Sequence, residues 1–185
     1  DYVAVDGEGR LSAAAVCGAL RQETVLVSIM HANNEVGSVQ PLAAIADAVR
    51  AHSPDVRIHS DAAQSVGKVA LDVSSDLRSV DMLTIVGHKI GAPKGVGALY
   101  IRSGLQLPKL LHGGGQESGR RAGTECVVLQ VGYGSSWYVK GRIYPSGGER
   151  HVATGSKRAL VAGGGWQVAG GRRQVAGGRW QVAGR

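Results

Sequence analysis

Four short polar clusters in the first 125 residues of this 185-residue chain contain side chains that can do chemistry. They are HANNE at 31–35, HSDAAQ at 59–64, GHK at 87–89 and GGGQESGRRAGT at 113–124. Each cluster follows an apolar run or lies between two expected elements. The loops that follow parallel strands meet at one edge of an α/β sheet, where ligands bind. We therefore expect several of these clusters to converge.

Lys89 is the residue best suited to covalent chemistry. It follows the run Thr84-Ile-Val-Gly-His and comes directly before a glycine-rich turn, so we expect its amine to be poorly solvated. Removal from water lowers the pKa of a lysine and leaves the free amine available for Schiff-base formation. The alternative is an ordinary surface lysine at the end of a strand. Lys94 is the weaker candidate because Pro93 and Gly95 place it in a turn.

Asp61 and Gln64 are the second pair of candidates. An aspartate after a short strand is commonly a cap or a turn residue. Together with Gln64 and Lys89, however, Asp61 would complete a set of carboxylate, amide and amine at one sheet edge. Such a set can hold a heteroaromatic cofactor through three different groups.

Nucleotide loops and metal sites are not supported. Residues 91–95 do not have the spacing of a P-loop, and residues 95–98 lack the third glycine of the dinucleotide fingerprint. The histidines at 31, 59, 88 and 112 match no standard zinc-ligand spacing, so we expect no metal.

The elements expected to position these clusters alternate between strand and helix. Apolar or β-branched runs predict strands over 2–5, 25–30, 56–59, 81–86 and 97–101. Helical patterns cover 12–20, with Ser12 as the N-cap, and 43–52, which must end before Pro54. This alternation predicts an α/β fold with a largely parallel sheet.

The chain changes character near residue 126. Residues 1–125 hold 12 Lys+Arg and 13 Asp+Glu, whereas residues 126–185 hold 9 basic residues and a single acid. The second part ends in the repeat WQVAGGR, RQVAGGR, WQVAGR, whose glycines disfavour a coiled coil. We interpret 126–185 as an irregular, low-complexity tail, or an artefactual one. A basic arm that binds nucleic acid, with tryptophans for stacking, is the less favoured alternative.

Several general features limit where the protein can act. Two cysteines, Cys17 and Cys126, are too few for a disulfide framework, which fits a reducing compartment. No apolar run approaches the roughly 20 residues that span a bilayer. The first residue is aspartate, so we expect further sequence upstream. A cytoplasmic location is expected, with a mitochondrial one left open.

Four strings of the sequence resemble, in order, the class V aminotransferase family of pyridoxal-phosphate enzymes. The resemblance is strongest to its cysteine desulfurases and selenocysteine lyases. The strings are VSIMHANNEVG (27–37), HSDAAQSVGK (59–68), TIVGHKIGAPKGVGALY (84–100), and HGGGQE (112–117) continued by RAGTE (121–125). The resemblance implies part of the large domain of fold type I, a parallel-rich α/β sheet with helices on both faces, over residues 1–125.

The resemblance also implies roles for single residues. Lys89 matches the lysine that bonds covalently to pyridoxal 5'-phosphate, and Asp61 matches the acid paired with the pyridinium nitrogen, which keeps the ring an electron acceptor. Gln64 matches the partner of the ring hydroxyl. Asn34 matches a contact near the ring or substrate, and His88 a residue on the phosphate side. Thr124 matches a threonine that reaches the cofactor phosphate of the other subunit.

The implied reaction removes sulfur or selenium from L-cysteine or L-selenocysteine to give L-alanine, in a homodimer that can pass the atom to an acceptor protein. Residues 84–89 lean toward selenocysteine lyases. Neither cysteine matches the family's catalytic cysteine, and the resemblance stops near Glu125, so we expect the chain to be incomplete as an enzyme. The alternatives are another class V aminotransferase and an inactive fragment whose basic tail binds nucleic acid.

Overall fold

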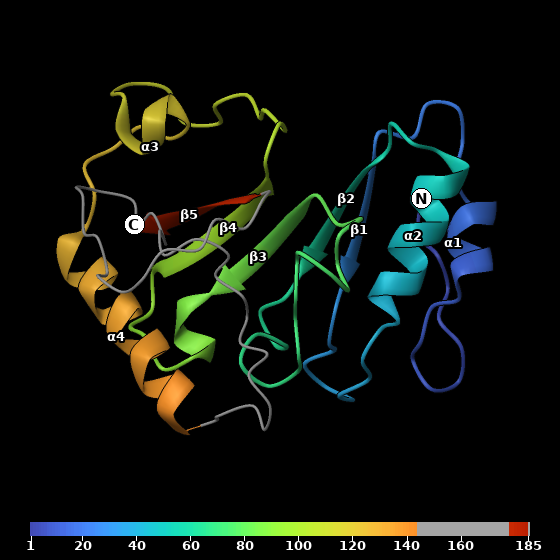
Figure 1. The fold of residues 1–185 in the computed structure, drawn as a ribbon, viewed down its shortest axis with the longest axis horizontal. Helices are drawn as coiled ribbons and strands as arrows, with labels where there is room; N and C mark the ends of the chain where they lie inside the picture. Colours follow the sequence, from blue (N-terminus) through green and yellow to red (C-terminus); the bar gives the residue numbers. More distant parts are fainter. Residues whose placement is uncertain (144–177, 185) are drawn as a thin grey trace.

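The computed structural model describes residues 1–143 and 178–184, which form one five-stranded sheet flanked by helices (Figure 1). In chain order the elements are α1 (Ala13–Gly18), β1 (Leu26–Met30), α2 (Leu42–His52), β2 (Arg57–Asp61), β3 (Met82–Val86), the 3-10 turn η1 (Gly87–Lys89), β4 (Val96–Arg102), α3 (Gln116–Gly119), α4 (Val127–Ile143) and β5 (Gly178–Gly184). None of the described helices is long and apolar enough to cross a membrane.

The sheet is mixed, and its parallel part consists of β1, β2 and β3. Its order is β1-β2-β3-β4-β5; β1, β2 and β3 are mutually parallel, and β4 and β5 are each antiparallel to their neighbours. Parallel neighbours need a crossover of a dozen or more residues. Only residues 87–95 join β3 to β4, so this connection makes the strand pair antiparallel. The sequence predicted the strand but not its direction.

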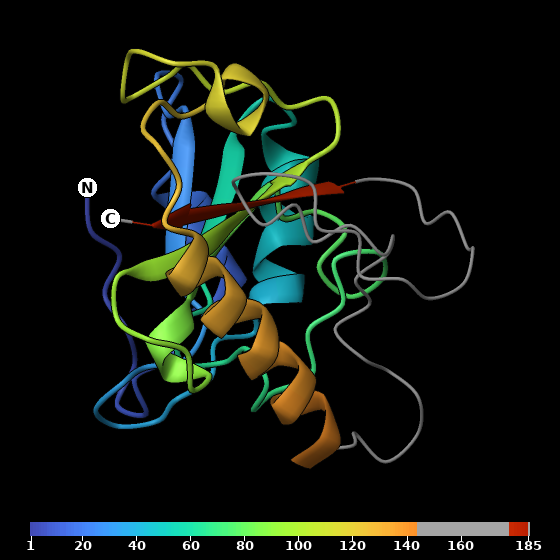
Figure 2. The same ribbon diagram turned by 90° about the vertical axis from the view of Figure 1, so that its left-hand side faces the viewer.

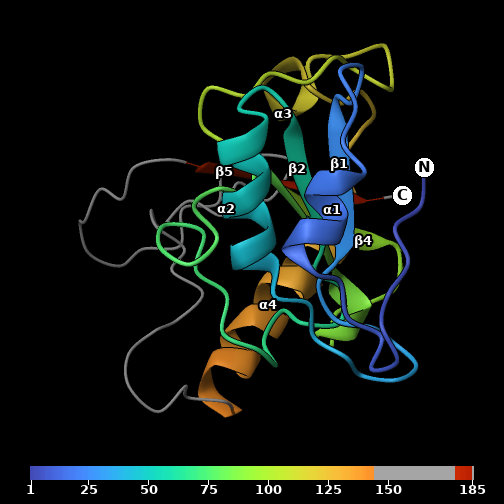
Figure 3. The same ribbon diagram turned by 90° about the vertical axis from the view of Figure 1, so that its right-hand side faces the viewer.

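Helices α1 and α2 lie at the β1 end of the sheet, and α4 lies at the β4–β5 end (Figure 1). Viewed from one end, α1 and α2 lie in front of the strands (Figure 3), and from the other end α4 does (Figure 2). Helix α2 buries a stripe at the i, i+3, i+4, i+7 spacing of an amphipathic helix: Leu42, Ile45, Ala46 and Val49. These side chains belong to the same buried cluster as Ile29 of β1 and Ile58 of β2.

The first residues of the chain differ from the prediction, whereas the first helix begins where it was predicted. Residues 2–5, expected to form a strand, pair with no strand among the described residues, although their sequence is β-branched. The predicted N-cap is confirmed, because the Ser12 hydroxyl accepts a hydrogen bond of 3.1 Å from the Ala15 amide.

The prediction of an irregular tail from residue 126 is wrong for two segments. Residues 127–143 form α4, and residues 178–184 form β5, which pairs with β4 along seven register positions. Helix α4 approaches the β3–β4 connection because Gly132 has no side chain to collide with Pro93. Single-sequence patterns miss such a helix, since packing offsets the low helix propensity of its glycines. The repeats before residue 178 lie outside the described residues.

A buried ion pair fixes the amino end of β3 against α2. The Arg50 guanidinium donates to the Asp81 carboxylate at 2.6 Å, and the Asp81 side chain is only 8% exposed. The same carboxylate oxygen accepts the Ile58 amide of β2 at 2.8 Å. Arg50 also donates to the carbonyls of Pro54 and Val56. One ion pair therefore ties together α2, the loop after it, β2 and the entry to β3.

We predict that Asp81→Asn lowers the free energy of unfolding by about 2–4 kcal/mol, because Arg50 would keep its charge in a site that no longer offsets it. Urea unfolding followed by tryptophan fluorescence measures this change. The matched control is the exposed pair Arg78–Asp47, at 3.9 Å. Arg78→Met should cost less than about 0.5 kcal/mol. Equal losses in the two variants would contradict the anchoring role of Asp81.

Candidate functional site

The parallel pairing of β2 with β3 brings Asp61 and Lys89 to one edge of the sheet. Asp61 is the last residue of β2 and lies opposite Thr84 of β3 in the register. Lys89 is in η1, which follows β3 without a break. The carboxyl ends of these strands point to the lower side of Figure 1, where η1 lies. The predicted convergence of these two clusters at the carboxyl edge is thus what the sheet topology produces.

Asp61 is half-buried and has one carboxylate oxygen engaged. Its Oδ1 accepts the Ala63 amide at 2.8 Å, which fixes the carboxylate at the start of the following turn. Its backbone carbonyl accepts the His31 amide at 2.9 Å. The described hydrogen bonds to the Asp61 side chain engage Oδ1 alone. None of the described residues bonds to Oδ2, so this oxygen is available to a donor on a ligand.

Gln64 lies in the turn that follows β2. Its Oε1 accepts a hydrogen bond from Lys68 Nζ at 3.1 Å, one helical turn later in the sequence. Because the lysine occupies the oxygen, the amide nitrogen of Gln64 is the group left to donate to a ligand. A donor at this position fits a phenolic or phenolate oxygen.

The turn η1 exposes Lys89 and buries Gly87. A Cβ on Gly87 would lie 2.7 Å from the Val96 carbonyl oxygen and 3.0 Å from the Tyr133 ring. Glycine thus lets the chain pass between β4 and α4, and the turn then carries His88 and Lys89 outward, where both are exposed. The prediction that Lys89 is poorly solvated is wrong for the described residues. Among them, its amine makes no hydrogen bond or ion pair.

Asn34 lies in the loop after β1, at the same carboxyl edge. Residues 33–38 form a closed turn, in which Asn33 Oδ1 accepts the amides of Glu35 and Val36 at 2.8 and 3.0 Å. Asn33 is therefore committed to the loop itself. Asn34 is exposed and free of such bonds among the described residues.

Thr124 is the predicted site residue that does not follow one of the parallel strands. It is exposed in the loop between α3 and α4. Helix α3 lies on the upper side of Figure 1, and the loop runs from it to the start of α4, as Figure 2 also shows. No described hydrogen bond or ion pair joins Thr124 to the residues around Lys89.

The segment that leads to Thr124 is strained. Glu117 and Ser118 both have a φ of 56°, in the left-handed region that non-glycine residues rarely adopt. The Oε1 atoms of Gln116 and Glu117 are buried without a hydrogen-bond partner. Burial raises the pKa of the Glu117 carboxyl to about 7, and Glu125 adds to this while Arg121 and Arg120 oppose it.

A row of polar side chains crosses the open face of the sheet beside Asp61. His59 Nδ1 is 2.8 Å from the Ser28 hydroxyl of β1, and His59 Nε2 is 2.9 Å from the Thr84 hydroxyl of β3. The sequence alone gives no role to Ser28 or Thr84, and it marks His59 as a member of the HSDAAQ cluster and as a rejected metal ligand. Their alternation with apolar residues was visible, but strand register was needed to bring them together.

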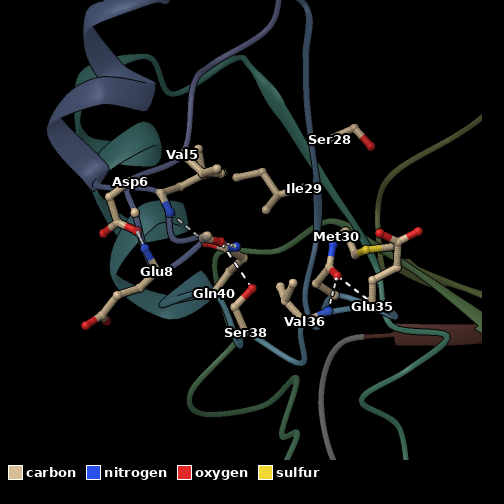
Figure 4. Close-up of a pocket in the computed structure, with 14 residues that line it drawn as sticks. Val5, Asp6, Glu8, Ser28, Ile29, Met30, Glu35, Val36, Ser38 and Gln40 are labelled. Atoms are coloured by element: carbon tan, nitrogen blue, oxygen red, sulfur yellow. Dashed lines mark hydrogen bonds between the residues drawn. The ribbon is translucent and has the colours of Figure 1, made fainter.

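A cavity of about 590 Å³ lies between the loop 5–9 and β1 (Figure 4). Its lining includes Ser28, Met30 and Asn33. Gln40 holds that loop in place, because its Oε1 accepts the Leu11 amide and its Nε2 donates to the Gly9 carbonyl, both at 2.8 Å. None of the residues predicted to bind the cofactor lines this cavity.

Comparison with known proteins identifies the fold and the family. The sequence model described as "Aminotransferase class-V" matches residues 1–137. This chain belongs to the class V aminotransferase family. The match includes the first part of α4, so the family resemblance extends beyond the boundary predicted near Glu125. Members of the family are pyridoxal-phosphate enzymes, so the cofactor expected from the sequence is confirmed at the level of the family.

Several curated relatives of this class V chain are named cysteine desulfurases. It is 44% identical over 135 residues to cysteine desulfurase IscS of Dictyoglomus turgidum, covering 73% of this chain and 33% of the relative. A solved NifS-like protein superposes with a TM-score of 0.72 at 37% identity, covering 77% of this chain and 38% of the other. The solved SspA in complex with cysteine gives 0.65 at 46% identity, covering 70% and 37%. The chain thus spans about a third of the length of its curated relatives.

We predict that Gly87→Ala lowers the free energy of unfolding of this class V chain by about 1–3 kcal/mol, because the new methyl group meets the Val96 carbonyl and the Tyr133 ring. Gly7→Ala is the matched control, since a Cβ there has nothing within 4 Å. Urea unfolding of both variants measures the difference. If both variants unfold like the unmodified chain, the close packing around η1 is refuted.

We predict that Glu117→Gln stabilises the protein more at pH 8 than at pH 5. The folded-state pKa of about 7 is above the ordinary value of 4.5, so the unfolded chain loses this proton first as the pH rises. Stability from this group is therefore present at low pH and lost on the way to pH 7. The difference should reach about 1–2 kcal/mol, less than the full shift implies because the carboxyl is not completely buried.

Urea titrations of both proteins at several pH values would measure this change. Glu23→Gln serves as the control, because the Glu23 side chain is 75% exposed. Its stability curve should run parallel to that of the unmodified chain. A parallel curve for Glu117→Gln would show that the Glu117 carboxyl is solvated.

Proposed function

We propose that this chain is the part of a cysteine desulfurase-type enzyme that attaches pyridoxal phosphate, with Lys89 as the attachment residue and Asp61 as the partner of the ring nitrogen. The observation that carries this proposal is the common position of the two groups at the carboxyl ends of the adjacent parallel strands β2 and β3. Lys89 offers an amine without a partner among the described residues, and Asp61 offers an unbonded carboxylate oxygen. This donor set fits an aldehyde and a protonated pyridine nitrogen.

The cofactor would supply an electron-withdrawing ring conjugated to the carbon that loses a proton. Asp61, fixed by the Ala63 amide, would keep the ring nitrogen protonated through a charge-assisted hydrogen bond. The Gln64 amide nitrogen would donate to the ring hydroxyl. His88, next to Lys89 in η1, would meet the phosphate side. Lys89 Nζ would take and return a proton once its amine is free, as a general base and acid.

L-cysteine is the substrate that the relatives favour for the complete enzyme. The curated matches are called cysteine desulfurases, and one similar solved protein, SspA, was determined in complex with cysteine. L-selenocysteine is the alternative substrate, because residues 84–89 resemble those of selenocysteine lyases more closely. Removal of sulfur leaves L-alanine and requires a thiol to accept the atom, so an acceptor protein is a natural partner of the reaction.

A homodimer would explain the position of Thr124. Within one chain this threonine is exposed, has no described bond to the residues around Lys89, and follows the strained helix α3. A second subunit could bring its own Thr124 loop to the cofactor phosphate.

The test is to incubate the full chain with pyridoxal phosphate, treat it with borohydride and locate the pyridoxyl group by peptide mass spectrometry. We expect the label at Lys89 and its loss in Lys89→Arg. Lys94→Arg is the matched control, because Lys94 is also exposed and lies in the next turn. Asp61→Asn should weaken binding about tenfold or more through the lost charge. A label spread evenly over the surface lysines would contradict the proposal.

A further inference from the structure

The pairing of β2 with β3 is the shortest backbone pairing between the strands that carry the site. It covers only three register pairs, from His59–Met82 to Asp61–Thr84, whereas β1 with β2 and β3 with β4 each have five. Fewer backbone bonds leave a strand pair easier to open locally. The one backbone bond just beyond Asp61 joins the Ala62 amide to the Thr84 carbonyl at 2.9 Å.

His59 adds a side-chain link across this short pairing. Its ring bonds to Thr84 on one side at 2.9 Å and to Ser28 on the other at 2.8 Å, so one imidazole joins β1, β2 and β3. All three side chains are on the face of the sheet that also carries Asp61, two residues after His59. Side-chain pairs of this kind are the unit that stabilises strand pairing.

The two strands joined by the His59–Thr84 bond carry the two groups whose spacing matters most. Asp61 ends β2, and Lys89 is in the turn that directly follows β3. A shift of β2 along or away from β3 would change the separation of the carboxylate and the amine. A misplacement of about 1 Å in such a constellation can cost roughly 100-fold in rate.

We propose that His59 is a positioning residue, which holds the carboxyl end of β2 against β3 through Thr84 and Ser28 and so sets the spacing between Asp61 and Lys89. The significance of that spacing for cofactor binding rests on the proposed function. His59 itself touches neither substrate nor cofactor in this scheme.

The protonation state of His59 suits this role. Burial lowers the pKa of the His59 imidazole, and the opposing effect of the Asp61 carboxylate is smaller. A neutral imidazole has one donor and one acceptor nitrogen, and a hydroxyl can serve either of them. Both links can therefore form at once, in either tautomer, without a charge that would compete for Asp61.

The first experiment measures hydrogen exchange of the Ala62 amide in the full chain by NMR. In His59→Phe, which removes both links and keeps a planar ring, we expect exchange at Ala62 to speed up about 3- to 10-fold. Thr84→Val removes only the link across β2 and β3 and should have a similar effect. Ser28→Ala is the matched control, because its link crosses the neighbouring strand pair, and it should have a smaller effect.

The Arg102 amide, which bonds to the Asp81 carbonyl at 2.8 Å, provides the internal reference. Its exchange should stay unchanged in all three variants. If Ala62 and Arg102 speed up together, His59 stabilises the protein generally and the positioning role is refuted. No change at Ala62 would refute it as well. Thr84→Val, which keeps side-chain volume, decides the matter if His59→Phe does not fold.

The second experiment tests whether the link acts through Asp61. The dissociation constant for pyridoxal phosphate, read from its absorbance, should rise about 3- to 10-fold in His59→Phe. In an Asp61→Asn background the same substitution should have no further effect, as in a double-mutant cycle. His59→Gln, which can restore one of the two bonds, should recover part of the affinity.

The two experiments separate the failure of this inference from the failure of the proposed function. If the unmodified chain does not bind the cofactor at Lys89, the proposed function fails, while faster exchange at Ala62 still shows the link between the strands. If the cofactor binds and His59→Phe leaves its dissociation constant unchanged, the positioning role is wrong and the proposed function stands.

Discussion

The parallel contact between β2 and β3 is the constraint on which the candidate site depends. Its amino end is fixed by Asp81, whose carboxylate bonds both Arg50 of α2 and the Ile58 amide of β2. Its carboxyl end is fixed by the bond from His59 to Thr84. The two strands share only three register pairs, and the His59–Thr84 bond crosses them diagonally. In the proposed scheme these side chains support the positions of Asp61 and Lys89.

The rest of the structure strengthens this contact from the other face. The apolar stripe of α2 packs on the side of the sheet that carries Ile29 and Ile58, and the polar row of His59 lies on the opposite side. One face of β2 therefore supplies hydrophobic stabilisation and the other supplies chemistry. Strand alternation makes this division possible, because successive side chains point to opposite faces.

The sequence predicted the elements that have a strong local signal. The apolar run 81–86, the helix ended by Pro54 and the Ser12 cap depend on neighbouring residues, and the structure agrees with them. The position of Asp61 and Lys89 at one edge also followed from the alternation of strand and helix. The proposed roles of these residues came from family resemblance and remain predictions.

What the sequence could not predict depends on contacts between distant residues. The antiparallel direction of β4, the helix at 127–143 and the row from Ser28 to Thr84 all arise from pairing or packing partners far away in the chain. The exposure of Lys89 also depends on such distant contacts. An apolar run predicts a buried strand, but the tight turn after Gly87 decides which way the following residues point.

The proposed exchange of the Thr124 loop between two subunits has a consequence for inheritance. If two subunits exchange these loops as proposed, each complete site takes Lys89 from one chain and Thr124 from the other. A mixed pair with one Lys89-defective and one Thr124-defective chain would keep one intact site, whereas a pair of either defective chain would keep none. Two alleles that are each inactive could therefore restore partial activity in the same cell.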